Sequence, residues 1–104
     1  MNTTDYDLHA TQNGIRIHLK GQFNFHARKA FNQASQKALH HADGREIALD
    51  MADIDYMDSA ALGMLLLLRD KAGKYGKQIV LKRAQGQVLE ILQVANFDRL
   101  FDIA

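Results

Sequence analysis

The chain contains no cysteine among its 104 residues, which excludes a disulfide framework and a cysteine-based zinc site. An excess of charge of one sign is also lacking, because 13 basic and 12 acidic residues leave a net charge of +1. This balance argues against nucleic acid or an anionic membrane as the main partner. The absence of cysteine is compatible with a reducing cytoplasm, which is where we expect the protein to reside.

Long hydrophobic runs are missing as well. The longest, residues 60–68, is interrupted by Gly63 and is far too short to span a bilayer. Residues 1–7 are polar and lack the basic-plus-apolar pattern of a secretory signal peptide. No repeat or linker divides the chain, and nearly half of its residues are apolar. We therefore expect one cytoplasmic domain over residues 1–104 that is not embedded in a membrane.

The sequence also lacks the motifs of common catalytic and cofactor sites. Ser59 is not part of a Gly-x-Ser-x-Gly elbow, because Met57 and Ala61 stand where the glycines are expected. There is no Walker loop and no Gly-x-Gly-x-x-Gly segment. The aspartates within residues 50–58 do not have calcium-loop spacing, and the histidines at 40–41 have no third ligand at a fixed spacing. We expect no enzymatic activity, no cofactor and no metal site.

The apolar periodicity changes along the chain from the period of strands to that of helices and back. Residues 6–10 and 15–20 alternate apolar and polar positions around Asn13-Gly14, which predicts an antiparallel hairpin. Later segments predict helices at residues 25–42, 59–75 and 88–95, and strands at residues 47–51, 78–82 and 100–104. This order predicts an α/β fold with a mixed β-sheet, an N-terminal antiparallel hairpin followed by parallel strands, flanked by helices.

Two short segments are expected to end strands. Gly21-Gln22-Phe23-Asn24 ends the second strand, and Asn24 suits the N-cap of the helix that follows. Residues 52–58 are expected to form a short acidic loop after the third strand. His9 and His18 occupy polar positions of the first two strands, which leaves open a cross-strand pair or two solvated side chains.

Ser59 lies where the expected acidic loop meets the second long helix. The start of a helix offers unpaired N–H groups and the positive end of the helix dipole, which favour an added negative charge. Ser59 is therefore a candidate for phosphorylation. A simpler interpretation exists, since Ser59 or Asp58 also suits the N-cap of this helix.

A helical wheel divides this helix into two faces. The face expected to pack on the sheet contains Ala61, Leu65, Leu68, Ala72 and Tyr75. The opposite face contains Ser59, Gly63, Leu66, Leu67, Asp70 and Lys74. An apolar patch beside a modifiable serine suits protein docking, unless another element of the domain covers Leu66 and Leu67. A phosphate on Ser59 would add negative charge close to Asp55 and Asp58, so we expect it to oppose binding.

Four segments resemble the STAS domain family, named for sulphate transporters and anti-sigma factor antagonists. The resemblance covers nearly the whole chain. The most specific segment is similar to the family's Asp-Ser-(Ser/Ala)-(Gly/Ala)-Leu-Gly signature and lies, as in the family, between a strand and a helix. The four segments are Gly21-Gln22-Phe23-Asn24, Ile47-Ala48-Leu49-Asp50-Met51, Met57-Asp58-Ser59-Ala60-Ala61-Leu62-Gly63 and Phe97-Asp98-Arg99-Leu100-Phe101.

The resemblance to stand-alone anti-sigma factor antagonists implies a non-enzymatic partner switch in a bacterial signalling pathway. The unphosphorylated domain would bind an anti-sigma factor or a serine kinase of the histidine-kinase-like ATPase type. Phosphorylation of Ser59 would break this complex, and a PPM-type phosphatase would restore it. On this basis, we expect the partner-binding surface to include Asn24, Asp58, Gly63 and Leu67.

The chain departs from the family pattern in two places. Relatives commonly have Gly-Glu-Leu-Asp at residues 21–24, so Asn24 replaces an aspartate that lies near the phosphoserine in them. Relatives also usually continue into a further C-terminal helix beyond the position of Ala104, so we expect one flank of the sheet to be open, or covered by a partner or a second copy.

The resemblance also implies an alternative function. Some STAS-like domains brace a transporter ATPase, including those of lipid-transport systems, and are not phosphorylated. The chain would then be a structural subunit of a transporter ATPase complex, and its apolar helix face would be a permanent interface.

Overall fold

The structure is a computed structural model that describes residues 5–41 and 44–104. Its strands form one sheet in the order β1-β2-β3-β4-β5, in which β1 and β2 are antiparallel and the other neighbours are parallel. The strands are β1 (Asp5–Ala10), β2 (Gly14–Phe23), β3 (Glu46–Met57), β4 (Gln78–Lys82) and β5 (Asp102–Ile103). The helices are α1 (Arg28–Leu39), α2 (Ser59–Lys74) and α3 (Gly86–Val94), with short 3₁₀ turns η1 (Phe25–Ala27) and η2 (Phe97–Arg99). The predicted fold class, an α/β domain with a mixed sheet, is confirmed.

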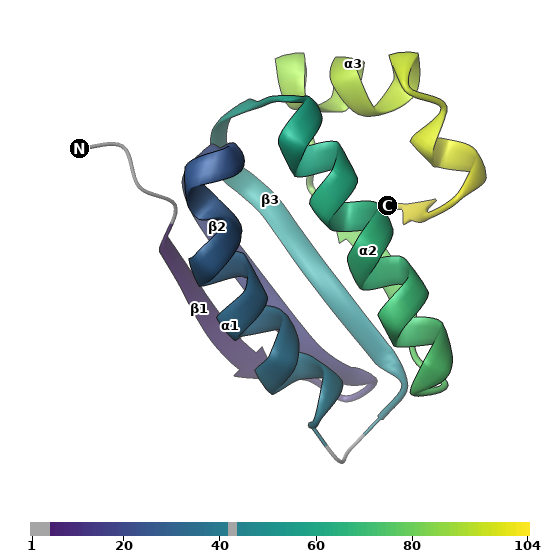
Figure 1. The fold of residues 1–104 in the computed structure, drawn as a ribbon. Helices are drawn as coiled ribbons and strands as arrows, with labels where there is room; N and C mark the ends of the chain where they lie inside the picture. Colours follow the sequence, from purple (N-terminus) through teal and green to yellow (C-terminus); the bar gives the residue numbers. More distant parts are fainter. Residues whose placement is uncertain (1–4, 42–43) are drawn as a thin grey trace.

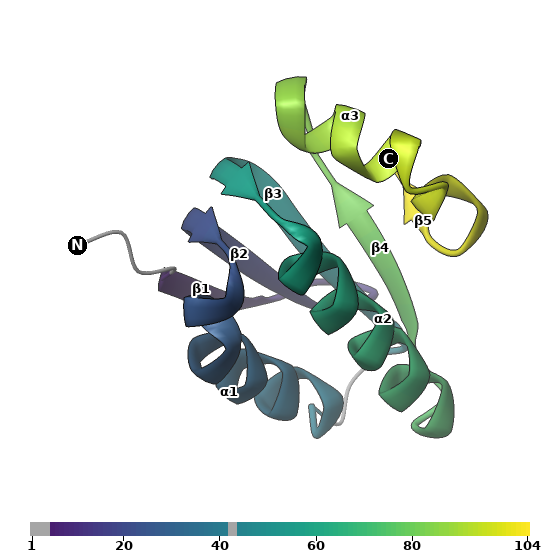
Figure 2. The same cartoon turned by 45° about the horizontal axis from the view of Figure 1, so that its top comes forward.

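Helices α1 and α2 cover one face of the sheet and enclose the core. In Figure 1 they lie side by side in front of the strands, and Figure 2 shows α3 at the end of the sheet toward which β4 runs. Burial alternates along β2, where Ile17 is fully buried, whereas residues 47–51 of β3, with Ile47 and Leu49, are buried throughout. Phe23 and Phe31, with ring centroids 5.0 Å apart, join the end of β2 to α1. The continuous burial of residues 47–51 and 79–81 is typical of interior strands, whereas the alternation along β2 is typical of a strand covered on one face.

The predicted helices and later strands are confirmed, with differences at their ends. β4 spans residues 78–82 as predicted, and α2 begins at Ser59 and ends before Gly76, whose φ of 69° suits a glycine. The first helix is shorter than predicted because residues 25–27 form the separate turn η1, and its predicted end at residues 42–43 lies outside the described residues. β5 is also shorter than predicted. None of the helices in the described parts of the chain is long and apolar enough to cross a bilayer.

The two predicted interruptions of strands are wrong. β2 continues to Phe23 and β3 continues to Met57, and these two residues pair in the parallel register. The ladder between them has register shifts, one of them at Gly21, which has a φ of 92°. Bulges let paired strands continue past residues that disturb a simple alternation, so neither this glycine nor the acidic composition of residues 52–58 ends the pairing.

The face of the sheet away from the helices carries charged side chains that pair between neighbouring strands. Asp7 of β1 forms an ion pair with Lys20 of β2, with 2.7 Å between Oδ2 and Nζ. His18 of β2 lies 2.7 Å from Asp53 of β3, between Nε2 and Oδ2. The hydrogen bond and the positive charge of Lys20 hold the pKa of Asp7 below its usual range. Charges of opposite sign thus link neighbouring strands on this face.

The two histidines of the hairpin have different environments. His18 lies opposite Asp7 in the antiparallel register and its ring contacts Asp53, so the cross-strand pair that the sequence left open is absent and the solvated interpretation holds for His9 alone. His9 is exposed and lies opposite Arg16. The Asp53 partner could not be predicted, because the expected acidic loop placed this aspartate outside the sheet.

Candidate functional site

The structure brings the two central sequence candidates to the same end of the sheet. Phe23 and Met57, the last residues of β2 and β3, are paired, and the Asp58 N–H donates to the Phe23 carbonyl at 3.3 Å. Asn24 and Ser59 therefore lie on neighbouring turns, where β2 passes into η1 and β3 passes into α2. The carboxyl ends of adjacent parallel strands are a common location for binding sites.

Asp58, and not Ser59, is the N-cap of α2. Asp58 has extended backbone angles, and its Oδ1 accepts a hydrogen bond from the Ala61 N–H at 3.1 Å. Ser59 is the first residue of the helix and is exposed, and no hydrogen bond of its hydroxyl is found among the described residues. The capping function is thus fulfilled by its neighbour, which leaves the Ser59 hydroxyl accessible.

Replacing the N-cap tests this assignment. Asp58→Ala is expected to lower the free energy of unfolding by about 1 kcal/mol, because the first turn of α2 loses its side-chain acceptor. Asp58→Asn keeps an acceptor oxygen and is expected to stay within a few tenths of a kcal/mol of the wild type. Urea denaturation measures both. A stable Asp58→Ala variant together with a destabilised Ser59→Ala variant would show that Ser59 is the cap.

The two predicted faces of α2 are largely confirmed. Ala61, Leu65, Leu68 and Ala72 are buried, whereas Leu67 is 60% exposed. On the opposite side of the helix lie Ser59, Gly63, Leu66 and Leu67, all exposed, which we call the α2 surface. Apart from its chain neighbours and the backbone of its own helix, no described atom lies within 4 Å of the position that a Cβ would occupy at Gly63, so the helix backbone is accessible there. Within the described parts of the chain, Leu66 keeps 37% of its surface exposed, so the rest of the domain buries neither leucine completely.

Tyr75 does not belong to the buried face as predicted. It is 49% exposed and is the C-cap residue of α2, beyond the last full turn of the helix. Its ring instead meets His40 edge to face, with 5.4 Å between the ring centroids. A helical wheel places residues correctly only as far as the helix extends, and this helix ends at Lys74.

Two exposed aromatic residues near the same end of the sheet were not predicted. Phe25 in η1 and Tyr56 at the end of β3 are both exposed. The Arg28 guanidinium lies 3.9 Å from the centroid of the Phe25 ring and donates to the Phe25 carbonyl at 3.2 Å. Exposed aromatic residues are typical of protein interfaces. The sequence analysis expected Phe25 in a helix and Tyr56 in a loop, and neither expectation indicated that an aromatic ring would be exposed there.

The charges close to Ser59 are mainly negative. Asp58 adjoins Ser59, and Asp55, four positions before Ser59, is exposed near the end of β3. Asp50 and Asp53 each bind a basic side chain, Arg83 and His18 respectively. No cluster of three metal-ligating side chains occurs in residues 5–41 and 44–104. The four aspartates therefore do not converge on a cation.

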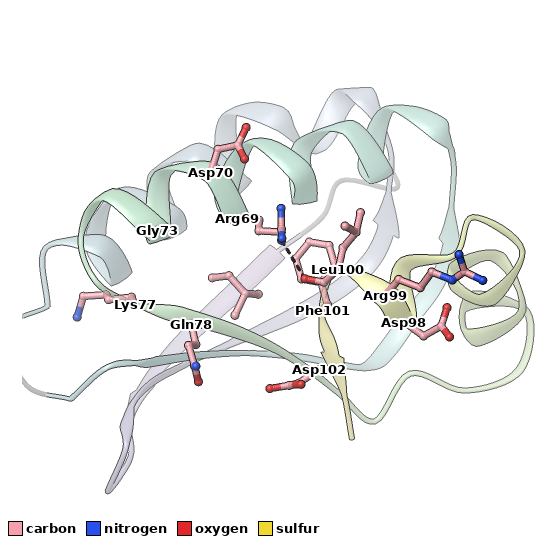
Figure 3. A pocket seen from close by; sticks show the side chains of 11 residues that line it. Arg69, Asp70, Gly73, Lys77, Gln78, Asp98, Arg99, Leu100, Phe101 and Asp102 are labelled. Carbon is pink, nitrogen blue, oxygen red and sulfur yellow. Dashed lines mark hydrogen bonds between the residues drawn. The ribbon is translucent and has the colours of Figure 1, made fainter.

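A separate hollow of about 500 Å³ lies between the C-terminal half of α2 and the β4–β5 edge (Figure 3). Arg69 points into it, and its Nε donates to the Leu100 carbonyl at 2.9 Å. The other charged lining residues carry both signs: Asp70, Lys77, Asp98, Arg99 and Asp102. Small-molecule sites are usually enclosed and mostly apolar, with a few convergent polar groups. The α2 surface, which shares no residue with this hollow, is the better candidate site.

The fold and the site define a small α/β domain that presents a serine at the first position of an exposed, partly apolar helix. The family described as "Mlab, STAS domain" matches residues 7–102, and the chain belongs to this family. A curated relative, the STAS-domain containing protein PA14_20770 of Pseudomonas aeruginosa, is 39% identical over 90 residues, which cover 86% of this chain and 87% of the relative. The resemblance expected from the signature segments is thereby confirmed.

Solved structures share the fold at low sequence identity. An anti-sigma factor antagonist from Mycobacterium paratuberculosis has a TM-score of 0.83 at 15% identity, covering 96% of this chain and 84% of the other. The anti-sigma factor antagonist SpoIIAA in its unphosphorylated form has a TM-score of 0.66 at 17% identity, covering 92% and 97%. The Bacillus cell fate determinant SpoIIAA in the phosphorylated form has a TM-score of 0.70 at 17% identity, covering 96% and 91%.

Proposed function

We propose that this protein is a partner-switching regulator of the anti-sigma factor antagonist type. Unmodified, it binds its partner through the α2 surface; phosphorylation of Ser59 releases the partner. The observation that carries the proposal is the accessible Ser59 hydroxyl, which Asp58 frees from capping, on the same face of α2 as the exposed Leu66 and Leu67 two turns further along. A phosphate at this position brings up to two negative charges into a surface that must lose its water on binding, next to the Asp58 carboxylate.

The partner that we propose is an anti-sigma factor or a serine kinase of the histidine-kinase-like ATPase type, with a PPM-type phosphatase acting on the modified form. The Asp-Ser-Ala-Ala-Leu-Gly signature at residues 58–63 supports this class of partner. The shared fold with proteins described as anti-sigma factor antagonists supports it further. On the same grounds we propose a cytoplasmic location, no enzymatic activity, no nucleic-acid partner and no part embedded in a membrane.

Asn24 and Asp58 complete the proposed partner-binding surface together with Gly63 and Leu67. The Asn24 Oδ1 accepts from the His26 N–H at 3.0 Å, which fixes the turn beside Ser59. Because asparagine is neutral, this turn adds no negative charge next to a phosphate. Gly63 permits close approach of a partner backbone, since no side chain stands above the helix there.

An apolar hollow extends the proposed surface toward α3. It has a volume of about 320 Å³ and is lined by Leu62 of α2, by Ile91 and Val94 of α3 and by Ala95 directly after α3, with Gln87 and Glu90. Leu62 follows the signature serine by three positions and so lies on the same end of α2. A neighbouring apolar hollow is suited to receive an apolar side chain of the partner.

Leu67→Glu tests the proposed surface. The change places a charge on an exposed position, so the free energy of unfolding is expected to stay within about 0.5 kcal/mol of the wild type. Partner binding is expected to fall at least about tenfold, because a carboxylate is desolvated in the complex. The measurement is quantitative mass spectrometry of anti-sigma factors and histidine-kinase-like ATPases captured from native cells. Leu100→Glu, an exposed leucine outside the α2 surface, is the matched control and is expected to bind as the wild type; equal loss in both variants contradicts the proposal.

The second candidate function is a structural subunit of a transporter ATPase complex. The match to the family described as "Mlab, STAS domain" supports this second function, and so does the exposed apolar character of Leu66 and Leu67. In this function the α2 surface is a permanent interface. Stable co-purification with a membrane-associated ATPase, unchanged by a negative charge at Ser59, distinguishes it from the partner switch.

A further inference from the structure

Strand β1 forms one edge of the sheet in the described parts of the chain. It lies at the end of the strand order and pairs with β2 without a register shift over Asp5–Ala10. The opposite edge, β5, has only two residues. Natural proteins usually blunt edge strands with proline, bulges or very short length, because free N–H and C=O groups invite a further strand. β1 has none of these three features, although Asp5 and Asp7 give it charged side chains, which also discourage unspecific pairing.

The hydrogen bonds of the hairpin show which residues face the free edge. The Thr11 N–H donates to the Gly14 carbonyl at 2.9 Å, so the backbone groups of Thr11 point toward β2. Backbone groups of successive residues in a strand point to opposite edges, so those of Tyr6, Leu8 and Ala10 point away from β2. Consistently, the Tyr6 N–H bonds to the Asp5 side chain, with 2.8 Å to Oδ1, and not to the neighbouring strand.

We propose that β1 pairs antiparallel with β1 of a second copy of this chain, about a two-fold axis at Leu8. In this register the backbone of Leu8 bonds to Leu8 of the second copy, and Tyr6 bonds to Ala10 of the second copy. The two sheets become one continuous sheet. Such an interface is isologous, because each copy contributes the same strand.

The side chains of β1 select this register. It places Asp7 opposite His9 of the second copy. By symmetry, His9 then lies opposite Asp7 of the second copy, so that two pairs of an acidic and a basic side chain form on the face of the sheet away from the helices. A two-fold axis at Asp7 would set Asp7 against itself, and an axis at His9 would set His9 against itself. An axis at Tyr6 would set Asp5 against Asp7. Like charges directly opposite each other destabilise a sheet, so the axis at Leu8 is the favourable one.

The apolar side of the same strand is compatible with this pairing. Tyr6 and Leu8 are only partly buried and pack at the margin of the core. In the dimer Leu8 contacts Leu8 of the second copy and extends the core across the edge. In Figure 1, β1 lies at the opposite side of the sheet from α2. The dimer therefore leaves both α2 surfaces exposed, and the inference does not depend on the proposed function.

Disulfide cross-linking tests the register, because the chain has no cysteine of its own. Asp7→Cys and His9→Cys variants are mixed and oxidised mildly. Directly opposed residues of antiparallel strands have Cα atoms about 4.5–5.5 Å apart, within the reach of a disulfide. We expect covalent dimers in the mixture, because the cysteine of one variant then faces the cysteine of the other. The native His9 and Asp7 of the two copies still face each other in this mixed dimer. Either variant alone is expected to form few covalent dimers. Efficient cross-linking of one variant alone, or no cross-linking in any sample, overturns the proposal.

Charge changes at His9 test the association in solution by sedimentation equilibrium over a concentration series. His9→Lys is expected to tighten the dimer and His9→Asp to weaken it about tenfold, since each change is repeated by the symmetry. Within one chain His9 lies opposite Arg16, so the stability of the monomer is expected to change in the opposite direction. Leu67→Glu is the control and is expected to leave the dimer unchanged. A wild type that stays monomeric throughout, or a dimer lost in Leu67→Glu, overturns the proposal.

Discussion

Ser59→Asp is expected to reduce partner binding about 100-fold, corresponding to about 2.7 kcal/mol of binding free energy. The aspartate adds a negative charge to the α2 surface beside Asp58, and this charge must be desolvated in the complex. The fold is expected to stay intact, because an acidic residue in the first turn of a helix interacts favourably with the helix dipole. Thermal unfolding of the variant is therefore expected to match or slightly exceed that of the wild type.

Two further variants separate charge from shape at this position. Ser59→Asn has nearly the size of aspartate without its charge and is expected to bind far better than Ser59→Asp. Ser59→Ala removes the hydroxyl and is expected to bind as the unmodified wild type. The measurement is calorimetric titration with the purified partner. Equal affinity of Ser59→Asp and Ser59→Ala would contradict the partner switch and favour the structural-subunit function.

Arg83→Ala is expected to lower the free energy of unfolding by about 2 kcal/mol at neutral pH, more than Asp58→Ala. The loss arises because the substitution leaves the Asp50 carboxylate buried without its cation. The Asp50 side chain is 2% exposed, and the Arg83 Nε donates to its Oδ1 at 3.0 Å while Nη2 binds Oδ2. The Ala52 N–H also donates to this carboxylate. The magnitude is below that of a fully buried pair, since the Arg83 side chain is 63% exposed.

Arg83→Gly is the matched variant for the backbone at this position. Arg83 has a φ of 59°, a left-handed conformation that costs a non-glycine residue about 1 kcal/mol. Glycine removes this cost together with the ion pair, so the loss of stability is expected to be about 1 kcal/mol smaller than for Arg83→Ala. Urea denaturation of both variants measures the difference. Equal stability of the two variants would contradict the assigned backbone strain.

The stability difference between Arg83→Ala and the wild type is expected to shrink at acid pH. Burial raises the pKa of Asp50, but the hydrogen bonds from Arg83 and the Ala52 N–H and the positive charge of Arg83 outweigh it and hold the pKa below its usual range. A lowered pKa in the folded state contributes stability above the ordinary pKa of about 3.9, and this contribution is lost as the pH falls through the folded value. Urea denaturation from pH 7 downward measures it, and a difference independent of pH would contradict the ion pair.

The fold was predictable from sequence wherever periodicity and turn residues agreed. The Asn13-Gly14 hairpin, the start of α2 at Ser59 and the strand β4 are all present. The extensions of β2 and β3 were not predictable, because they depend on pairing between two segments far apart in the chain. Each segment alone contains residues that disfavour strands, and only their mutual ladder with its bulges makes them strands.

The positions within the candidate site were only partly predictable. The sequence offered Ser59 and Asp58 equally as the N-cap, and the choice required the Asp58 Oδ1 contact with the Ala61 N–H. The exposure of Leu67 followed from the helical wheel, since α2 packs on the sheet along one face. Phe25 and Tyr56 could not be identified, because their exposure results from a 3₁₀ turn and a strand end that the local sequence does not specify.

The central claim is that phosphate on Ser59 and partner binding exclude each other. The most direct test separates partner-bound from free protein of native cells by size-exclusion chromatography and measures phosphate in each fraction by peptide mass spectrometry. The tryptic peptide of residues 46–69 contains Ser59 as its only serine, which permits an unambiguous assignment against Tyr56. We expect phosphate on Ser59 in the free fraction and none in the bound fraction. Equal phosphate occupancy in the two fractions would contradict the switch.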